Sequence, residues 1–533
     1  MSSRILTLLA LVLLSLGLRG ALAARHGLWT DEIFSLSMAT SHSLEHPADV
    51  ARPELGDFVQ EEAPVTPAGY RRYMEHEEGS SLSRVYRAVV LSDTSPPAYY
   101  LALYFWTLLF GTGDLSLRGM SIFWAILTIP LLMAVARRLG GRGAMLPSAF
   151  LVTMAPLGIL YDTEGRMYSQ LVFFTVLAAW STLELRRRRA GLGRCVLWTA
   201  TAALGLLTHY FFVFPWLAMC AWLALTTRRP AVRWRLAGCL LATGLLILPW
   251  YAGIPEGLAQ WRVTAGWLEM EGPPEPRAKL LAYAFLDYFN AAGSWTGDWK
   301  TRRLIRGAAL ALLAAALVLG GRRLPWRRQS FLVLWLLASV LGPAVFDQLM
   351  GTWTVLYPRY MLTGLPAVML LIGSALGKVA APLRAALCLA FGLLFGYCFL
   401  GGYALKTRSY CPMREVAEVL DREATAEDVV ILHSIPSGLA GVARYMESEV
   451  PVVDWVGQLG TREVPGSLEQ LARGSERIFV VQIHTVGEPA PQLDYLRENA
   501  RAVEDWNVEG VSISAFDSGT GRPQFETGAS DSR

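Results

Sequence analysis

Residues 28–35 read Leu28-Trp29-Thr30-Asp31-Glu32-Ile33-Phe34-Ser35 and place two adjacent carboxylates a few residues after the first long apolar run. If that run crosses a lipid bilayer, Asp31 and Glu32 lie at the membrane surface. A charged side chain at the edge of the hydrocarbon is costly, which makes the pair a candidate functional site. The alternative is a solvated acidic turn after a helix. The rest of the chain favours a functional site, because further charged and aromatic residues are predicted on the same side of the membrane.

The composition indicates a polytopic membrane protein. Of the 533 residues, 53% are hydrophobic and only 17% are charged, and apolar runs repeatedly exceed the length of a core helix. The net charge of +4 is unevenly distributed, because acids outnumber bases after about Ala404. The positive excess of the membrane part sets orientation and does not indicate nucleic-acid binding. The six cysteines show no paired spacing and are predicted to be small core residues: Cys195, Cys220, Cys239, Cys388, Cys398 and Cys411.

Basic clusters set the topology. With Arg4 in the cytoplasm and residues 98–110 not spanning, every cluster falls in the cytoplasm, as the positive-inside rule expects. The segment 98–110 is also shorter than the roughly 20 residues that a span needs. The eleven predicted spans are 5–24, 119–136, 143–160, 168–185, 195–208, 210–227, 236–253, 304–321, 329–349, 360–377 and 384–403. A cleaved signal peptide competes for the first, because Ala21-Leu22-Ala23 resembles a cleavage site.

The chain is expected to have three parts. Residues 1–403 form a transmembrane catalytic domain with residues 25–118 as its first outer loop. Residues 404–517 form an extracytoplasmic α/β domain, because the β-type runs 428–432 and 477–481 alternate with amphipathic stretches at 414–422 and 493–501. The Gly/Ser/Thr-rich residues 518–533 are predicted to be a disordered tail. The expected fold class is therefore an α-helical polytopic membrane protein with a small C-terminal α/β domain.

Polar residues gather on the outer face of this topology. The loop from Tyr161 to Tyr168 holds Asp162, Glu164 and Arg166 between its tyrosines, which is more charge than an interfacial turn needs. Asp93 precedes Pro96-Pro97 and adds a carboxylate, although capping a helix is its ordinary role.

Two further residues are candidates on the same face. His209 lies in a short turn between apolar runs and is a base, a metal ligand or a satisfied interfacial histidine. Arg359 lies at the outer mouth of the tenth span, where a guanidinium either holds a phosphate or extends to lipid headgroups.

The order of these motifs resembles that of a known family. Trp29-Thr30-Asp31-Glu32 is followed by Ser95-Pro96-Pro97-Ala98-Tyr99-Tyr100-Leu101, Leu117-Arg118, Gly140-Gly141-Arg142, the loop from Tyr161 to Tyr168, and Thr208-His209-Tyr210. This order resembles the GT-C glycosyltransferases of the protein O-mannosyltransferase and aminoarabinose transferase (ArnT) superfamily, most of all their bacterial RgtA-like relatives. The resemblance covers about the first 210 residues and extends loosely to Arg359.

The resemblance implies transfer of a sugar, with inversion, from a polyprenyl-phosphate donor to a lipid, glycan or protein acceptor on the outer face of the bacterial plasma membrane. Asp31 matches the general base that acts on the acceptor hydroxyl, and Glu32 supports it. Either Asp162 or Glu164 matches the second acid, beside Arg166. Ser95 stands where many relatives have His or Lys, so this position is not assigned to donor phosphate or to a metal. The resemblance leaves open whether a divalent metal is a cofactor.

Elementary chemistry agrees with this function. An inverting transfer needs a base, cations or a metal on the leaving phosphate, and a groove for a lipid. The outer acids, Arg166 and Arg359, and the aromatic segment from Tyr99 to Trp106 supply candidates for these parts. Tyr168 is a further candidate for substrate binding. No nucleotide-binding loop is present, which favours a lipid-linked donor. The alternatives are a transporter or flippase for a lipid-linked glycan, which would hold its polar residues at mid-membrane, and a noncatalytic envelope-assembly protein.

Overall fold

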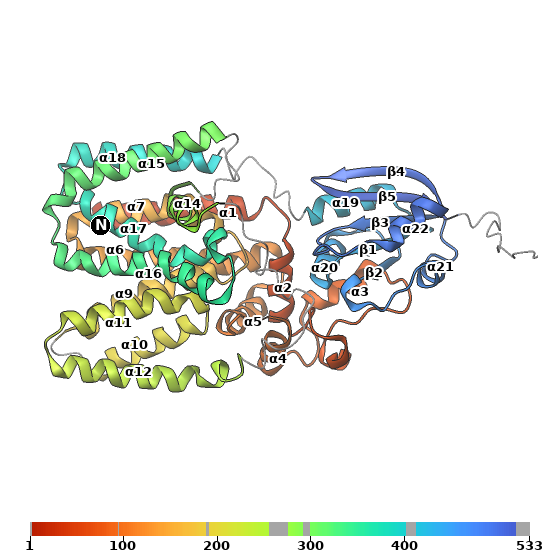
Figure 1. Cartoon of the computed structure of the whole chain (residues 1–533), viewed down its shortest axis with the longest axis horizontal. Coiled ribbons are helices and arrows are strands. Elements are labelled where there is room, and N and C mark those ends of the chain that lie inside the picture. Colours follow the sequence, from red (N-terminus) through yellow and green to blue (C-terminus); the bar gives the residue numbers. More distant parts are fainter. Residues whose placement is uncertain are drawn as a thin grey trace, which may run out of the picture.

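The computed structural model describes residues 3–93, 95–187, 191–254, 275–290, 299–400 and 412–518. A bundle of helices is joined at one end to a smaller sheet domain, and the helices of the first long loop lie between them (Figure 1). The predicted fold class is confirmed. The predicted boundary at 403/404, the tail beyond Ser518 and much of the loop 254–303 lie outside the described residues.

Among the described residues, seven helical segments are long and apolar enough to span a membrane. They are α1 (Ser3–Ala23), α6 (Asp114–Leu139), α12 (Pro230–Tyr251), α15 (Trp299–Gly320), α16 (Trp326–Met350), α17 (Leu365–Leu376) with the preceding 3-10 turn Pro358–Gly364, and α18 (Ala381–Phe399). The pair α7 (Met145–Met154) and α8 (Pro156–Asp162) would make an eighth, bent by 59°. The bend falls at Pro156, which cannot donate a backbone hydrogen bond.

Each of the eleven predicted spans coincides with a helix or with the bent pair, but three of the helices fall below this measure of length or hydropathy. The helix α9 (Tyr168–Leu185) includes the polar Gln170 and Glu184. The helices α10 (Leu192–Leu206) and α11 (Val213–Thr226) are short because the chain turns between them at His209.

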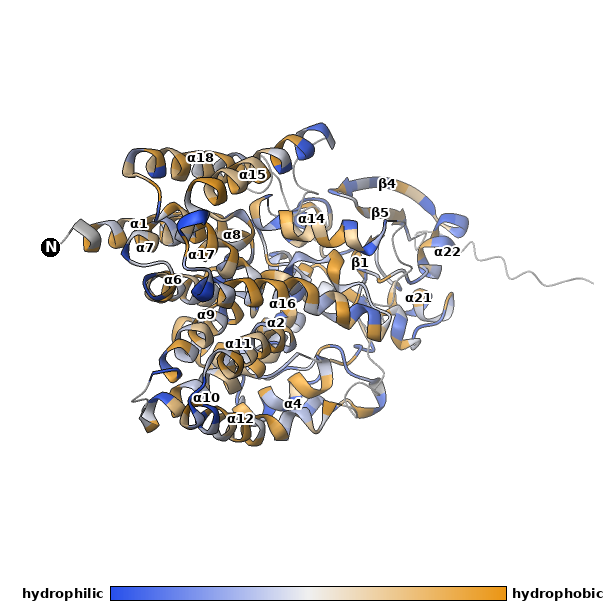
Figure 2. Cartoon of the chain, turned by 60° about the vertical axis from the view of Figure 1, so that its left-hand side comes forward, coloured by the Kyte–Doolittle hydropathy of each residue, from blue (hydrophilic) through white to orange (hydrophobic). Residues whose placement is uncertain are grey.

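The bundle is held by close helix crossings and presents apolar side chains outward. The helix α6 packs against α1, α7 and α9, while α17 packs against α7, α15 and α16. A Cβ at Gly320 would lie 2.0 Å from the carbonyl oxygen of Ala375, so α15 and α17 touch through their backbones. Apolar residues colour most of the outer helices (Figure 2), and large side chains such as Leu241 are exposed there, as a lipid environment requires.

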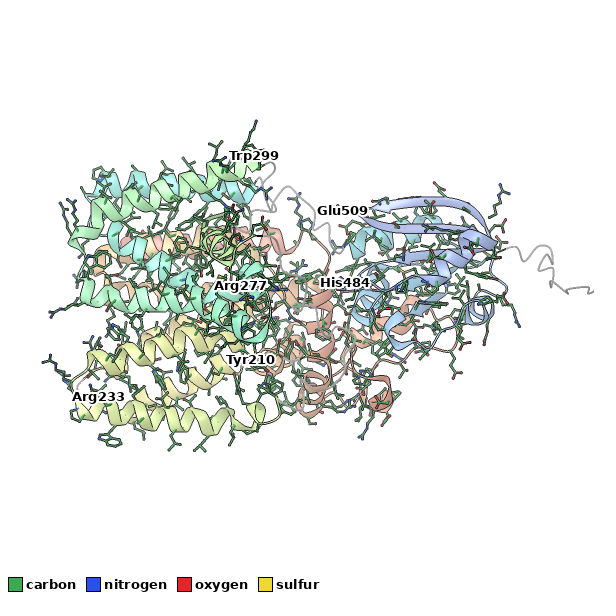
Figure 3. All side chains as sticks on the ribbon, viewed as in Figure 1. Tyr210, Arg233, Arg277, Trp299, His484 and Glu509 are labelled. Carbon is green, nitrogen blue, oxygen red and sulfur yellow. The ribbon has the colours of Figure 1, made fainter. Side chains whose placement is uncertain are left out.

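Basic residues collect at the end of the bundle farthest from the sheet domain. Arg323 donates to the carbonyl oxygen of Lys378 at 3.2 Å, and Arg138 pairs with Glu184. Arg233 lies at the same end (Figure 3). The predicted basic clusters therefore lie at one end of the bundle, as expected when successive spans alternate in direction.

The first long loop folds into short helices at the opposite end. They are α2 (Thr30–Ala39), α3 (Pro67–Arg71), α4 (Leu82–Ser92) and α5 (Ala98–Phe110). The helix α5 follows Pro96-Pro97, ends at Gly111, where φ is 78°, and packs against α2, α4 and α6. It is too short to cross a membrane by itself, as predicted.

The C-terminal part is a five-stranded mixed sheet with the order β2-β1-β3-β5-β4. The strands are β1 (Val429–His433), β2 (Val452–Trp455), β3 (Arg477–Gln482), β4 (Arg501–Val508) and β5 (Val511–Asp517), and the helices are α19 (Met413–Glu423), α20 (Pro436–Tyr445), α21 (Gly466–Leu471) and α22 (Pro491–Asn499). Both predicted strands are present as β1 and β3, which pair in parallel with Ile431 opposite Val480. The turn Glu509-Gly510 has positive φ at both residues, which suits a two-residue hairpin.

The sheet domain is fixed to the bundle through Asp114, at the start of α6. Its carboxylate accepts hydrogen bonds from Arg414, Arg444 and Tyr445 at 2.7–3.0 Å. The Tyr445 hydroxyl also accepts the backbone N–H of Leu28 at 2.6 Å, immediately before α2. This contact ties the position of the sheet domain to that of the two acids.

Candidate active site

The two adjacent acids begin α2, and their side chains lie in different environments. Successive residues of an α-helix point about 100° apart, so one acid faces the protein interior when the other faces its edge. The side chain of Asp31 is 32% exposed, whereas that of Glu32 is 0% exposed. Asp31 is therefore the member of the pair that a substrate can reach.

Glu32 is bound on both carboxylate oxygens. Its Oε1 accepts hydrogen bonds from Arg118 Nε at 2.8 Å and from the Gly165 N–H at 2.7 Å, while Oε2 accepts from Arg118 Nη2 at 2.6 Å. Arg118 also donates to the carbonyl oxygens of Ala23, His26 and Gly27, each at 2.7 Å. The pair joins α1, α2, α6 and the loop after α8, so Glu32 supports the site by holding these segments together.

Asp31 faces two guanidinium groups from distant parts of the chain. Its Oδ2 lies 3.5 Å from Arg359 Nη1 and 3.9 Å from Arg166 Nε. Arg166 is oriented by bonds from Nη1 to Ser35 Oγ at 2.8 Å and to the Asp31 carbonyl oxygen at 3.2 Å. Both distances to Oδ2 exceed the 2.7–2.9 Å of a charge-assisted hydrogen bond. Asp31 is therefore held near two cations without being locked to either.

Arg359 is presented by a loop that a buried acid organises. Asp347, near the end of α16, accepts hydrogen bonds from the backbone N–H groups of Thr354 and Val355 at 2.8 and 3.0 Å, and from the hydroxyl of Thr352 at 2.7 Å. The Arg359 guanidinium then lies over the rings of Tyr357 and Tyr360, with its carbon 5.0 and 5.5 Å from the centroids. These contacts orient the cation toward α2.

The loop after α8 contributes to the site unevenly. Asp162 pairs with Arg19 of α1 at 2.7 Å and accepts a hydrogen bond from Ser169 at 2.8 Å, in a separate small cavity between helices. It does not join Asp31 and Arg166. Glu164 is buried, and its backbone carbonyl accepts a hydrogen bond from Ser121 at 2.5 Å.

The remaining predicted site residues line or support the same region. Asp93, just after α4, accepts hydrogen bonds from the Tyr100 hydroxyl at 2.6 Å and the Ser95 N–H at 2.9 Å, and it does not cap α5, whose N-cap is Pro97. Tyr99 is fully buried beside Tyr100, with ring centroids 5.4 Å apart. These residues shape the inner wall of the site.

His209 and Tyr168 pack together beside Arg359. Their ring centroids are 6.2 Å apart, and His209 also contacts Tyr360. The His209 Nδ1 accepts the Phe211 N–H at 3.1 Å. Burial, with Arg166 and Arg359 nearby, lowers the pKa of His209 to about 3. Its imidazole is therefore neutral at physiological pH, and this geometry favours the satisfied interfacial histidine among the three predicted roles.

Three charged residues without a predicted role, Arg19, Arg118 and Asp347, make key contacts in the structure. Arg19 and Asp347 lie inside apolar runs, and a charge in such a run is itself a signal of function or pairing. Arg118 lies in the Leu117-Arg118 motif, but its partner Glu32 is 86 residues away. No spacing rule connects residues at that distance.

Metal ligation was the open question at this site. Among the residues that the structure describes, no group of three or more His, Cys, Asp or Glu side chains is arranged to hold a metal ion. The charged neighbours nearest to Asp31 are guanidiniums, which do not ligate metals. A divalent-metal cofactor therefore stays a prediction for this site.

Comparisons with known proteins identify related folds. Residues 94–252 match the family model described as dolichyl-phosphate-mannose-protein mannosyltransferase. The fold is similar to that of ArnT from Cupriavidus metallidurans in its apo state, with 14% identity over 90% of this chain and 95% of that chain and a TM-score of 0.52. The undecaprenyl phosphate complex of the same enzyme gives 14% identity over 91% and 96% of the two chains and a TM-score of 0.51. No curated protein sequence matches the chain.

Proposed function

We propose that this chain, a membrane glycosyltransferase of the GT-C superfamily that contains the protein O-mannosyltransferases and ArnT, transfers a sugar from a polyprenyl-phosphate donor with Asp31 as general base. The observation that carries the proposal is the position of the Asp31 carboxylate, partly exposed and facing two guanidiniums from separate segments. The undecaprenyl phosphate in the ArnT complex supports a donor of the same class.

The reaction is a single displacement with inversion. Asp31 takes the proton of the acceptor hydroxyl as its oxygen bonds to the anomeric carbon, and the bond from that carbon to the phosphate oxygen breaks. The leaving polyprenyl phosphate keeps the electron pair of the broken bond. Arg166 and Arg359 stabilise the charge that develops on the phosphate, and preoriented cations of this kind supply much of the stabilisation of such transition states.

The site is proposed to face the extracytoplasmic side of a bacterial plasma membrane. The support is the collection of basic residues at the opposite end of the bundle, represented by Arg323 and Arg138, because cytoplasmic loops carry the excess of Lys and Arg. The sheet domain lies at the same end as Asp31 and is extracytoplasmic on this orientation.

The proposal is tested by Asp31→Asn, which removes the basic lone pair and keeps the size of the side chain. General-base catalysis contributes about 10² to 10⁴ in rate, and sugar transfer from a polyprenyl-phosphate donor should fall by at least that factor. The assay uses membranes matched for protein level. Asp494→Asn, an exposed acid of α22, is the matched control and should retain full turnover.

Near-normal transfer by Asp31→Asn would show that another group is the base. If the unaltered protein transfers no sugar but moves a lipid-linked glycan across vesicles, the transporter alternative replaces this proposal. If it does neither and loss of the gene impairs envelope assembly, the noncatalytic alternative holds.

A further inference from the structure

We infer that a cavity between the first long loop and the sheet domain binds one sugar unit of a glycan acceptor that extends toward Asp31. The cavity has a volume of about 270 Å³. Phe58 and Gln60 line it from the loop, and Pro436, Leu459 and Thr461 line it from the sheet domain. The inference rests on the proposed function in one respect, namely that the bound glycan is the acceptor.

The lining combines apolar and hydrogen-bonding surfaces in the way a sugar requires. Leu44, Phe58 and Leu459 provide apolar contact for the C–H faces of a pyranose or furanose ring. Thr461 Oγ1 donates a hydrogen bond to Gln60 Oε1, and Gln60 Nε2 donates to the Asp454 carbonyl oxygen at 3.1 Å. A sugar hydroxyl would join this network through the remaining amide hydrogen of Gln60 and the oxygen lone pairs of Thr461. The volume is just below the 300–1,000 Å³ of pockets for drug-sized ligands, which suits one ring and excludes a polyprenyl tail.

The charges at the cavity favour a neutral ligand over a phosphate. Arg462 pairs with the buried Asp454 and donates to the Glu61 carbonyl oxygen at 2.8 Å. The Glu61 carboxylate pairs with Arg72 at 3.1 Å. Burial lowers the pKa of His46, so this lining imidazole is neutral at physiological pH. Arg462 therefore has a partner and His46 carries no charge. An anion bound in the cavity would gain little electrostatic stabilisation.

An extended peptide is disfavoured at the nearest sheet edge. Recognition by strand addition needs unpaired backbone groups along an edge strand. Val65 of the first long loop already pairs with Val452 of β2, through hydrogen bonds of 2.9 and 2.8 Å in the two directions. The loop therefore covers the β2 edge at this point.

The cavity and α2, which carries Asp31, both adjoin α20 of the sheet domain. Pro436 lines the cavity and begins α20, which packs against α2. His484, just after β3, lies beside this helix, because a Cβ at Gly438 would be 3.7 Å from the Cβ of His484. Figure 3 shows His484 on the side of the sheet domain that faces the bundle.

His484 is close enough to Asp31 for the two side chains to interact electrostatically. Its side chain is exposed, yet the surrounding protein lowers its pKa and the Asp31 carboxylate opposes that shift. Because His484 lies beside Gly438, two residues after the cavity-lining Pro436, an acceptor that extends from the cavity toward Asp31 would pass it, and His484 is expected to position that acceptor.

The test measures binding of methyl glycosides of neutral hexoses and N-acetylhexosamines to the full chain in detergent, by saturation-transfer NMR. At least one glycoside should bind, and Gln60→Ala and Thr461→Val should each weaken it at least tenfold. Gln470→Ala, at an exposed position of α21, is the matched control and should leave binding unchanged. Thermal unfolding of each variant must match the parent, and Thr461→Val is the safer variant because Thr461 is exposed.

Each outcome has a definite meaning. Absence of glycoside binding, binding that neither variant weakens, or full competition by polyprenyl phosphate would overturn the inference. In transfer assays with a glycan acceptor, His484→Ala and Thr461→Val should raise KM for that acceptor with little change in kcat. Glycoside binding that survives Asp31→Asn separates the two proposals, because the cavity then binds sugar whether or not Asp31 is the base.

Discussion

Replacing Glu32 by Gln tests whether the Glu32 carboxylate stabilises the fold or takes part in the reaction. The substitution keeps one carbonyl oxygen, which still accepts the Gly165 N–H, and replaces the other oxygen by an amide nitrogen. Arg118 then loses its charged partner and one of two hydrogen bonds, and the Trp29 N–H loses its acceptor at 3.2 Å. Because both side chains are almost fully buried, water cannot replace what is lost.

The expected cost is about 3 kcal/mol of unfolding free energy. Removing one partner of a buried ion pair typically costs 3–5 kcal/mol. The low end applies because Arg118 keeps the carbonyl oxygens of Ala23, His26 and Gly27. A loss of about 3 kcal/mol lowers the ratio of folded to unfolded protein by roughly 10².

Denaturant unfolding of the protein in detergent measures this cost, with Glu504→Gln on the exposed face of β4 as the control. The double variant Glu32→Gln with Arg118→Met should be less destabilised than the sum of the single variants, because no buried charge is left unpaired. Turnover per folded molecule of Glu32→Gln should stay well above that of Asp31→Asn. A Glu32→Gln protein of normal stability that transfers no sugar would refute the structural role and make Glu32 the base.

Three other changes test separate features of the site. Arg359→Lys should lower transfer at least tenfold with folding intact, because an ammonium cannot reproduce the planar, aromatic-stacked guanidinium; unchanged kinetics would exclude a phosphate contact. Asp114→Asn should increase hydrogen exchange in α20 and lower transfer, since Arg414 and Arg444 both lose their charged partner; unaltered exchange would show that other contacts hold the sheet domain. A reporter active only in the cytoplasm and fused after Gly466 should give no signal, and a strong signal would reverse the proposed orientation.

Local sequence pattern located the helices of the bundle and two of the five strands of the described sheet. Apolar runs located the helices because a span must be about 20 residues long, and the runs 428–432 and 477–481 located β1 and β3. The predicted spans 195–208 and 210–227 are present as α10 and α11, which are short because the chain turns between them at His209.

Residue order also pointed to the resemblance that agrees with the family match over residues 94–252 and with the similar fold of ArnT, and it singled out Asp31. The resemblance was visible because its motifs lie within short segments whose order can be compared at low overall identity. Asp31 stood out because an acid beside an apolar run is costly wherever it lies.

Only the tertiary structure decided which charged groups meet. Asp31 and Glu32 are adjacent in sequence, yet one is partly exposed between two guanidiniums and the other is buried against Arg118. Asp162, an equal candidate with Glu164 from the sequence, pairs with Arg19 across 143 residues of chain. Ion-pair partners are chosen by which helix faces pack together, and periodicity within one helix carries no information about the face of another.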